Sequence, residues 1–93
     1  MNKTEIIGEL AARTNITQAQ IGEIVNALLD ILTEYLEKHE KVSFLGFGIF
    51  EAKAYSERVA RNPRTKETVT IPAGYKPVFK ASRVLREKVN TAG

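Results

Sequence analysis

The element that decides the fold is the segment RVARNPRTK at residues 58–66. It holds four cations around an Asn-Pro turn signal and, besides the turn proline, one apolar residue larger than alanine, so it cannot form core. Strand-like sequence flanks it at residues 53–55 and 68–72. The pattern predicts a long two-stranded ribbon that carries cations to a turn at Pro63. Because a lone ribbon buries little surface, we expect it to gain order when an anionic partner binds.

The length and composition limit how the chain can build a core. Its 93 residues indicate one domain, and the ribbon removes roughly a quarter of them from any core. With no cysteine and one histidine, His39, neither a disulfide nor a zinc site is expected to supplement that core. Homodimerisation is then the expected way to bury enough apolar surface. We expect no membrane span and no signal peptide, and therefore a cytosolic protein.

The net charge of +3 conceals a strong asymmetry along the chain. Residues 1–52 carry four cations and eight anions, a net charge of −4, whereas residues 53–93 carry ten cations and three anions, a net charge of +7. Such a separation favours binding of nucleic acid or another anionic surface by the second half.

Two helices are predicted before residue 40. Each begins with a capping box, formed by Asn2 with Glu5 and by Thr17 with Gln20, and the second helix runs to about Lys38. The second helix is apolar over more than the usual third of its surface, which indicates burial on more than one side. The first helix and the sheet could bury this apolar surface of the second helix. In so small a protein, we expect a partner subunit to bury part of it instead.

Three strands are predicted next, at about residues 41–44, 49–55 and 76–80. A corner at Gly46-Phe47-Gly48 joins the first two, since its glycines allow a close backbone approach or a positive φ. Ser82 is predicted to cap a short last helix. Helices grouped before strands indicate the α+β class, with a three-stranded antiparallel sheet, a protruding ribbon arm and a C-terminal helix.

We treat residues 1–93 as a single domain. It comprises a helical dimerisation part at about residues 1–40, a sheet with the basic arm at about 41–81, and a C-terminal helix at about 82–91. On the strand at residues 49–55, alternation places Phe50, Ala52 and Ala54 on one face, and Glu51 and Lys53 on the other.

With this layout, the sequence resembles the bacterial histone-like HU/IHF family over essentially all of its residues. The resemblance rests on MNKTE at residues 1–5, GFGIF at 46–50, Arg58, Arg61-Asn62-Pro63 followed by Thr65, Ile71-Pro72-Ala73, and the ending from Phe79-Lys80 to Leu85. It implies an intertwined homodimer, or a heterodimer with a paralogue. Two β-arms would wrap duplex DNA through the minor groove, and a proline at each tip would wedge between base pairs, as architectural proteins of this family do.

The resemblance and the charge pattern together give a set of candidate residues. The candidate DNA-binding residues are Lys3, Lys53, Tyr55, Arg58, Arg61, Asn62, Pro63, Arg64, Thr65, Lys66, Lys76, Lys80, Arg83 and Arg86, with Pro63 as the intercalating residue. The candidate dimer core is Leu28, Leu29, Leu32, Phe44, Phe47, Phe50 and Phe79. Four arm residues, Tyr55, Val59, Ala60 and Lys66, depart from the common family pattern. Lys66 stands where the family commonly has glycine, and a lysine disfavours the positive φ that some turns need.

The function predicted is an architectural one: binding of duplex DNA largely without sequence specificity, with bending and compaction of the nucleoid. Site-selective, IHF-like bending is the alternative, and a module that pairs its ribbon edges with other proteins is a third reading. An enzyme is not expected, because the sequence offers no cysteine, no histidine cluster and no glycine-rich phosphate loop. No cofactor or metal is expected. A preference for bent, nicked or kinked DNA is expected, whereas RNA binding and the bend angle stay open.

Overall fold

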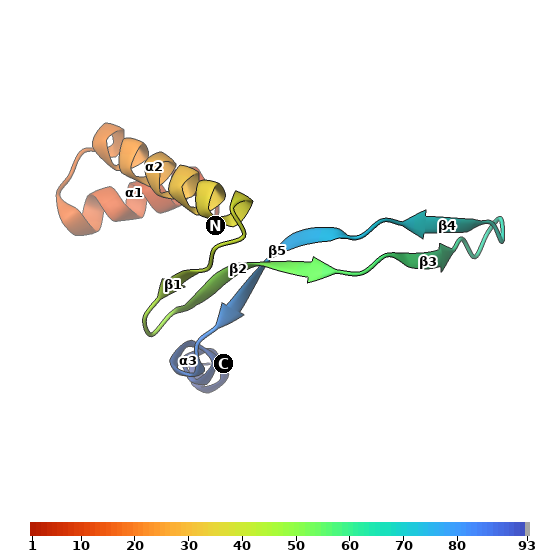
Figure 1. Cartoon of the computed structure of the whole chain (residues 1–93). Coiled ribbons are helices and arrows are strands. Elements are labelled where there is room, and N and C mark those ends of the chain that lie inside the picture. Colours follow the sequence, from red (N-terminus) through yellow and green to blue (C-terminus); the bar gives the residue numbers. More distant parts are fainter. Residues whose placement is uncertain (93) are drawn as a thin grey trace. The chain divides into compact units, whose positions relative to one another are not determined.

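The computed structural model describes residues 1–92, which fall into two compact units, residues 1–34 and residues from Tyr35 onward. The elements along the chain are α1 (Lys3–Thr14), α2 (Gln18–Glu37), β1 (Val42–Phe44), β2 (Gly48–Tyr55), β3 (Arg58–Arg61), β4 (Thr68–Ile71), β5 (Gly74–Ala81) and α3 (Arg83–Ala92) (Figure 1). The strands are antiparallel, and the helices precede or follow them. The predicted α+β class is therefore confirmed, with the arm built from its own pair of strands.

The two N-terminal helices begin where their capping residues predict. The side chain of Asn2 accepts a hydrogen bond from the backbone N–H of Glu5 at 2.9 Å, and its amide donates to the Glu5 carboxylate at 3.3 Å. The hydroxyl of Thr17 accepts from the backbone N–H of Gln20 at 3.2 Å. Helix α1 ends at Asn15, whose φ of 60° is the left-handed conformation common after a helix.

The three-stranded sheet has the order β1-β2-β5, and one of its faces is aromatic. Phe50 lies directly opposite Phe79 across the strands, and their ring centroids are 4.8 Å apart. Phe44 contacts Phe50 edge-on with a centroid distance of 6.1 Å, and Phe47 contacts Phe79 at 5.3 Å. These four phenylalanines of the candidate dimer core therefore form one aromatic cluster. Its rings nevertheless stay partly open, and Phe47 is 48% exposed in the single chain.

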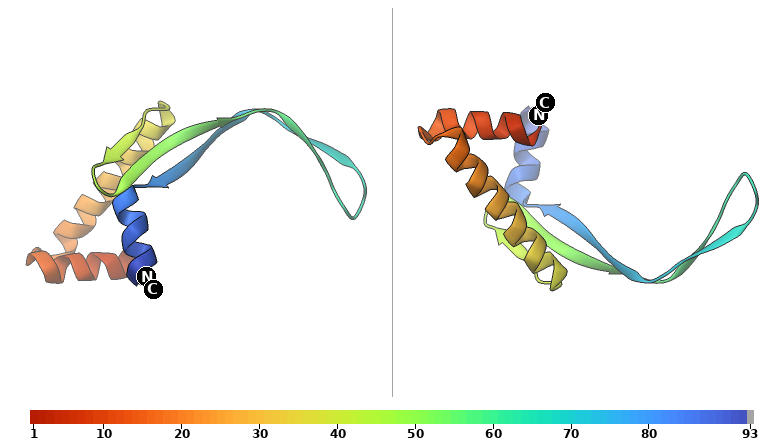
Figure 2. Two further views of the ribbon diagram at one scale, coloured as in Figure 1. Left: turned by 90° about the horizontal axis from the view of Figure 1, so that it is seen from below. Right: turned by 90° about the horizontal axis from the view of Figure 1, so that it is seen from above.

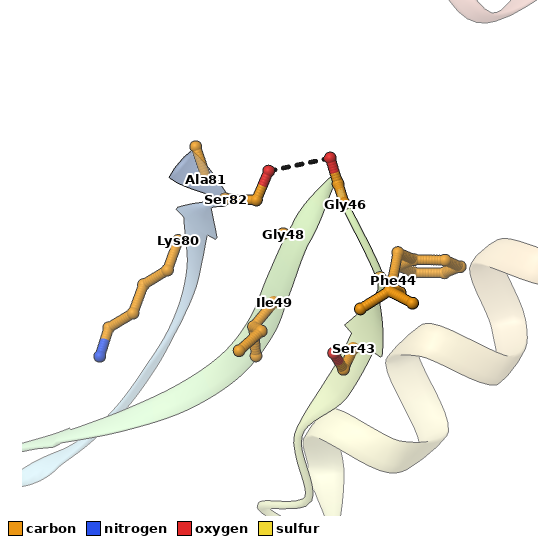
Figure 3. A pocket seen from close by; sticks show the side chains of 9 residues that line it. Ser43, Phe44, Gly46, Gly48, Ile49, Lys80, Ala81 and Ser82 are labelled. Carbon is orange, nitrogen blue, oxygen red and sulfur yellow. Dashed lines mark hydrogen bonds between the residues drawn. The ribbon is translucent and has the colours of Figure 1, made fainter. Parts of the chain in front are cut away.

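The corner between β1 and β2 fixes where the last helix starts. The N–H of Phe47 donates to the carbonyl of Phe44 at 2.9 Å, with Gly46 at a φ of +80° as the turn requires. The hydroxyl of Ser82 donates to the carbonyl of Gly46 at 2.9 Å, as Figure 3 shows, and accepts from the N–H of Leu85 at 3.1 Å. Ser82 therefore caps α3, as predicted, and ties it to the corner.

Gly48 allows β2 and β5 to approach closely at this corner. A methyl group at this position would lie 2.5 Å from the carbonyl oxygen of Lys80 and equally close to the ring of Phe79. Both contacts are far shorter than real side chains show, so the corner requires glycine here. A shallow pocket of about 250 Å³ between the corner and the end of β5 is lined by Phe44, Ile49 and their neighbours (Figure 3).

Candidate nucleic-acid interface

The arm is a ribbon of two short strands that extends beyond the sheet (Figures 1 and 2). In β3 and β4, Arg58 lies opposite Ile71 and Arg61 lies opposite Thr68. Since side chains alternate along a strand, Arg58 and Arg61 point to opposite faces of the ribbon. Both arginines are exposed. The ribbon thus offers a guanidinium on each of its faces.

The tip of the arm is a closed turn with Pro63 inside it. The N–H of Asn62 donates to the carbonyl of Glu67 at 2.9 Å, and the N–H of Lys66 donates to the carbonyl of Asn62 at 2.8 Å. The side chain of Asn62 also accepts from the N–H of Arg64 at 2.9 Å. None of these bonds needs an N–H from Pro63. The exposed proline ring is therefore presented by a turn that its neighbours hold together.

Lys66 adopts the positive φ that its side chain disfavours. Its φ is 60°, in the left-handed region that glycine occupies more readily. The Asn62 carbonyl holds the Lys66 N–H in this conformation, and the N–H of Glu67 makes a longer bond of 3.4 Å to the hydroxyl of Thr65. The turn therefore forms although residue 66 is a lysine and not the glycine common in the family. This lysine adds a fourth exposed cation to the arm.

Three predicted DNA-binding lysines share one face of the sheet. In the β2–β5 ladder Lys53 lies directly opposite Lys76, and Ile49 lies opposite Lys80, so all three lysines are on the face away from the aromatic cluster. All three are exposed. Like charges directly opposite one another destabilise a sheet. An anion bound between Lys53 and Lys76 would offset that repulsion.

Glu51 lies on this same face, as the alternation predicts, but it is buried. Glu51 is 8% exposed, because Lys80 and Lys41 lie over its carboxylate at 2.9 and 3.6 Å. The hydrogen bond from Lys80 is the main cause that lowers the pKa of Glu51, and the charges of both lysines lower it further. Lys80 is thus engaged in an ion pair within the protein, and Lys41, which the sequence did not single out, is its second cation.

The remaining candidates lie on the helices. Lys3 is the first residue of α1, in the first unit. Arg83 and Arg86 are exposed on α3, which follows the end of β5 that is remote from the arm. The guanidinium of Arg83 donates to the carboxylate of Glu87 at 3.0 Å, one turn further along the helix. Within one chain, the structure therefore groups the arm residues and the sheet lysines, but it does not bring the α3 arginines to the arm.

Other kinds of site find little support in the part of the chain that the structure describes. Within residues 1–92, no three acidic, histidine or cysteine side chains are grouped as a metal site would need. None of the helices described is both long enough and apolar enough to cross a membrane.

The comparison with protein families decides the assignment. The family model described as bacterial DNA-binding protein matches residues 1–90. The chain belongs to this family. The chain is also 44% identical to DNA-binding protein HU of Clostridium pasteurianum, over 97% of this chain and 99% of that protein. It is 42% identical to DNA-binding protein HU of Lactococcus lactis, over 95% of this chain and 97% of the relative. The predicted resemblance to the HU/IHF family is confirmed.

Solved structures of this family have the same fold. The Anabaena HU-DNA cocrystal structure matches with a TM-score of 0.89 and 37% identity, covering 96% of this chain and 97% of that chain. HU from Thermotoga maritima matches with a TM-score of 0.68 and 30% identity, covering 96% and 98%.

Proposed function

We propose that this protein is an architectural DNA-binding protein, which binds duplex DNA largely without sequence specificity and bends and compacts it. The observation that carries the proposal is the arm: four exposed cations and Pro63 are held on a ribbon that ends in a closed turn. The HU names of its relatives and a solved HU-DNA complex as a structural neighbour support the same function. Nucleoid association and the absence of an enzymatic role belong to this proposal.

The geometry suits the minor groove. A two-stranded ribbon with arginines on both faces can follow a groove while each guanidinium reaches a wall, and arginine is favoured where the minor groove is narrow. Pro63 carries no charge, and its ring is rigid, which suits it to wedge between two base pairs at a cost of a few kcal/mol of unstacking. We therefore assign phosphate and groove contacts to Arg58, Arg61, Arg64 and Lys66, and the wedge to Pro63.

Lys53, Lys76 and Lys80 extend this surface along the sheet. They continue from the base of the arm toward α3 on a single face, so one DNA segment can contact the arm and the sheet together. The carboxylate of Glu51 competes with DNA phosphates for Lys80 and Lys41. We therefore expect Lys53 and Lys76 to contribute more to DNA binding than Lys80, whose charge is already partly neutralised.

The proposal includes a homodimer. Among the described residues, Ile21 is the one apolar side chain that the single chain buries, at 4% exposure, although 43% of the sequence is hydrophobic. Much of the apolar surface of α2 is open, including Leu28, Leu29 and Ile31, and so is half of Phe47. A folded chain with so little core needs a cover for these surfaces. A second copy covers all of them and brings two arms to the same DNA.

Fluorescence anisotropy with two duplexes of unrelated sequence, each at two salt concentrations, tests this proposal. We expect similar affinities for both duplexes, and a steep linear fall of log affinity with log salt as counterions are released. Arg61→Ala should weaken binding to both and reduce the slope by roughly one contact per arm. Arg13→Ala is the matched control, because Arg13 is an exposed arginine on α1 that is not among the candidate DNA-binding residues. A flat salt response would contradict the proposal, and a preference of more than about 10³-fold for one sequence would favour site-selective binding.

A further inference from the structure

The arm joins the sheet across a short break in the strand pairing. The β2–β5 ladder ends at the pair Tyr55 and Gly74, and the ladder of the arm starts at the pair Arg58 and Ile71. Between them, residues 56–57 and 72–73 form no ladder pairs. The break has the same length on both strands, so no bulge fixes an angle there. The last pairs of the β2–β5 ladder must therefore set the direction in which the arm leaves the sheet.

The last of these pairs is covered by an aromatic ring. The Tyr55 ring lies against Gly74, since a methyl group at Gly74 would be 2.7 Å from the Tyr55 hydroxyl oxygen and 2.9 Å from the ring carbon that bears it. An aromatic side chain placed over a cross-strand glycine protects the exposed backbone and strengthens the pair. Tyr55 is 40% exposed, so more than half of its surface is already used within the chain.

The preceding pair is held on the opposite face by a second tyrosine. Tyr75 lies opposite Ala54, one step along the ladder, and so points to the other side of the sheet. Its ring stacks on His39 with a centroid distance of 3.7 Å and an interplanar angle of 21°. His39 belongs to the segment between α2 and β1, where its N–H donates to the carbonyl of Leu36 at 3.0 Å. The stack therefore joins the base of the arm to a segment that is itself anchored.

We propose that Tyr55 and Tyr75 form a clamp that grips the base of the arm from both faces and sets its direction. In this role Tyr55 is a positioning residue, which acts through Gly74 and the ladder instead of through a contact with DNA. A fixed arm base lowers the ordering cost of binding, because less conformational freedom is lost when the arm meets its partner. This consequence for DNA rests on the proposed function, whereas the clamp itself is a property of the free protein.

Amide hydrogen exchange of the free protein tests the clamp directly. In Tyr55→Ala and Tyr75→Ala, the amides of residues 52–55 and 74–76 should exchange roughly fivefold faster than in the wild type, as expected when a cross-strand contact is lost. Tyr55→Phe and Tyr75→Phe keep the rings and should exchange like the wild type. Val59→Ala is the control, because it removes an exposed side chain beyond the break. Unchanged exchange in both alanine variants would overturn the clamp.

Gly74→Ala is an independent check that leaves both tyrosines in place. The added methyl group must displace the Tyr55 ring, so the base of the arm should loosen as it does in Tyr55→Ala. Protection equal to that of the wild type would show that the ring does not hold this pair, and would count against the clamp.

The affinity for linear duplex DNA then tests whether a fixed arm base strengthens DNA binding. Tyr55→Ala should bind roughly fivefold more weakly than the wild type, and Tyr55→Phe should restore binding. If Tyr55→Phe is as weak as Tyr55→Ala while its exchange stays normal, the hydroxyl contacts DNA and the positioning role is overturned. If the wild type does not bind DNA, the proposed function fails, whereas faster exchange in the alanine variants still supports the clamp.

Discussion

Replacing Pro63 by alanine separates the bending of DNA from the attraction to it. The turn at the tip should survive, because its three hydrogen bonds join Asn62 to Glu67, Lys66 and Arg64 and do not involve Pro63. The entropic effect of losing a proline is about 0.4–1 kcal/mol, and it falls on an exposed turn outside the aromatic cluster. Thermal stability should therefore change little. What the variant loses is a rigid, uncharged wedge.

The size of this loss appears as a difference between DNA substrates. Unstacking one base step costs a few kcal/mol, and a nick has already removed part of that cost. The wild type should therefore prefer nicked over intact duplex by about 10–100-fold, where each tenfold step is about 1.4 kcal/mol. Without the wedge, Pro63→Ala gains little from a nick, and its preference should fall below about threefold. Its salt slope should match that of the wild type, because no cation is removed.

The assay is a paired anisotropy titration of intact and nicked duplexes of the same sequence, for the wild type, Pro63→Ala and Pro72→Ala. Pro72 is the matched control, because it is an exposed proline in the break at the base of the arm, away from the tip. A Pro63→Ala protein that still prefers nicked DNA as strongly as the wild type would show that Pro63 is only a turn residue.

Three further outcomes follow from the packing of the chain. Phe47→Ala should destabilise the protein by about 3–5 kcal/mol if a second subunit buries the exposed half of the ring; sedimentation of the wild type at twice the chain mass would support this, and a well-folded monomer would contradict it. Residues 56–71 should exchange their amide protons faster than α2 does in the absence of DNA, since the arm has no apolar layer against it, and equal protection would count against a free arm. Because the pKa of Glu51 is lowered on folding, its stabilising contribution should be complete above the ordinary value of 4.5 and be lost as the pH falls through the lower folded pKa. Thermal unfolding of Glu51→Gln should lack this part of the pH dependence, and an unaltered profile would show that the ion pair does not matter for stability.

Most of the fold could be predicted because its signals are local. Asn2, Thr17 and Ser82 each cap a helix through a residue three positions later, which the sequence displays directly. The ribbon was predictable in the same way, because the Asn-Pro turn signal lies between two segments of alternating polarity. The segment around this turn also carries too many cations to be buried. The glycine corner also behaves as its residues indicate, with a positive φ at Gly46 and a close approach at Gly48.

The features that sequence reasoning missed depend on which residues meet across strands. Alternation gives the face of Glu51 but not its burial, which comes from Lys80 on β5 and from Lys41 just before β1. The contact of Tyr55 with Gly74 follows from the register, which continues from the tip to the sheet without a bulge. Lys66 in the turn does adopt the positive φ that the sequence made less expected for a lysine than for a glycine.

The central claim, that the protein bends DNA as well as binding it, is tested most directly by ring closure of short duplex fragments. Such fragments are stiff, because their length is comparable to or below the persistence length of DNA of about 150 base pairs. If the wild-type protein bends DNA at its arms, ligase should close these fragments into circles faster when the protein is bound. The closure rate should rise with the amount of protein bound, and it should do so for fragments of unrelated sequence. If the protein saturates the fragments without increasing the rate of circle formation, it binds DNA but does not bend it. That result would contradict the proposed architectural role.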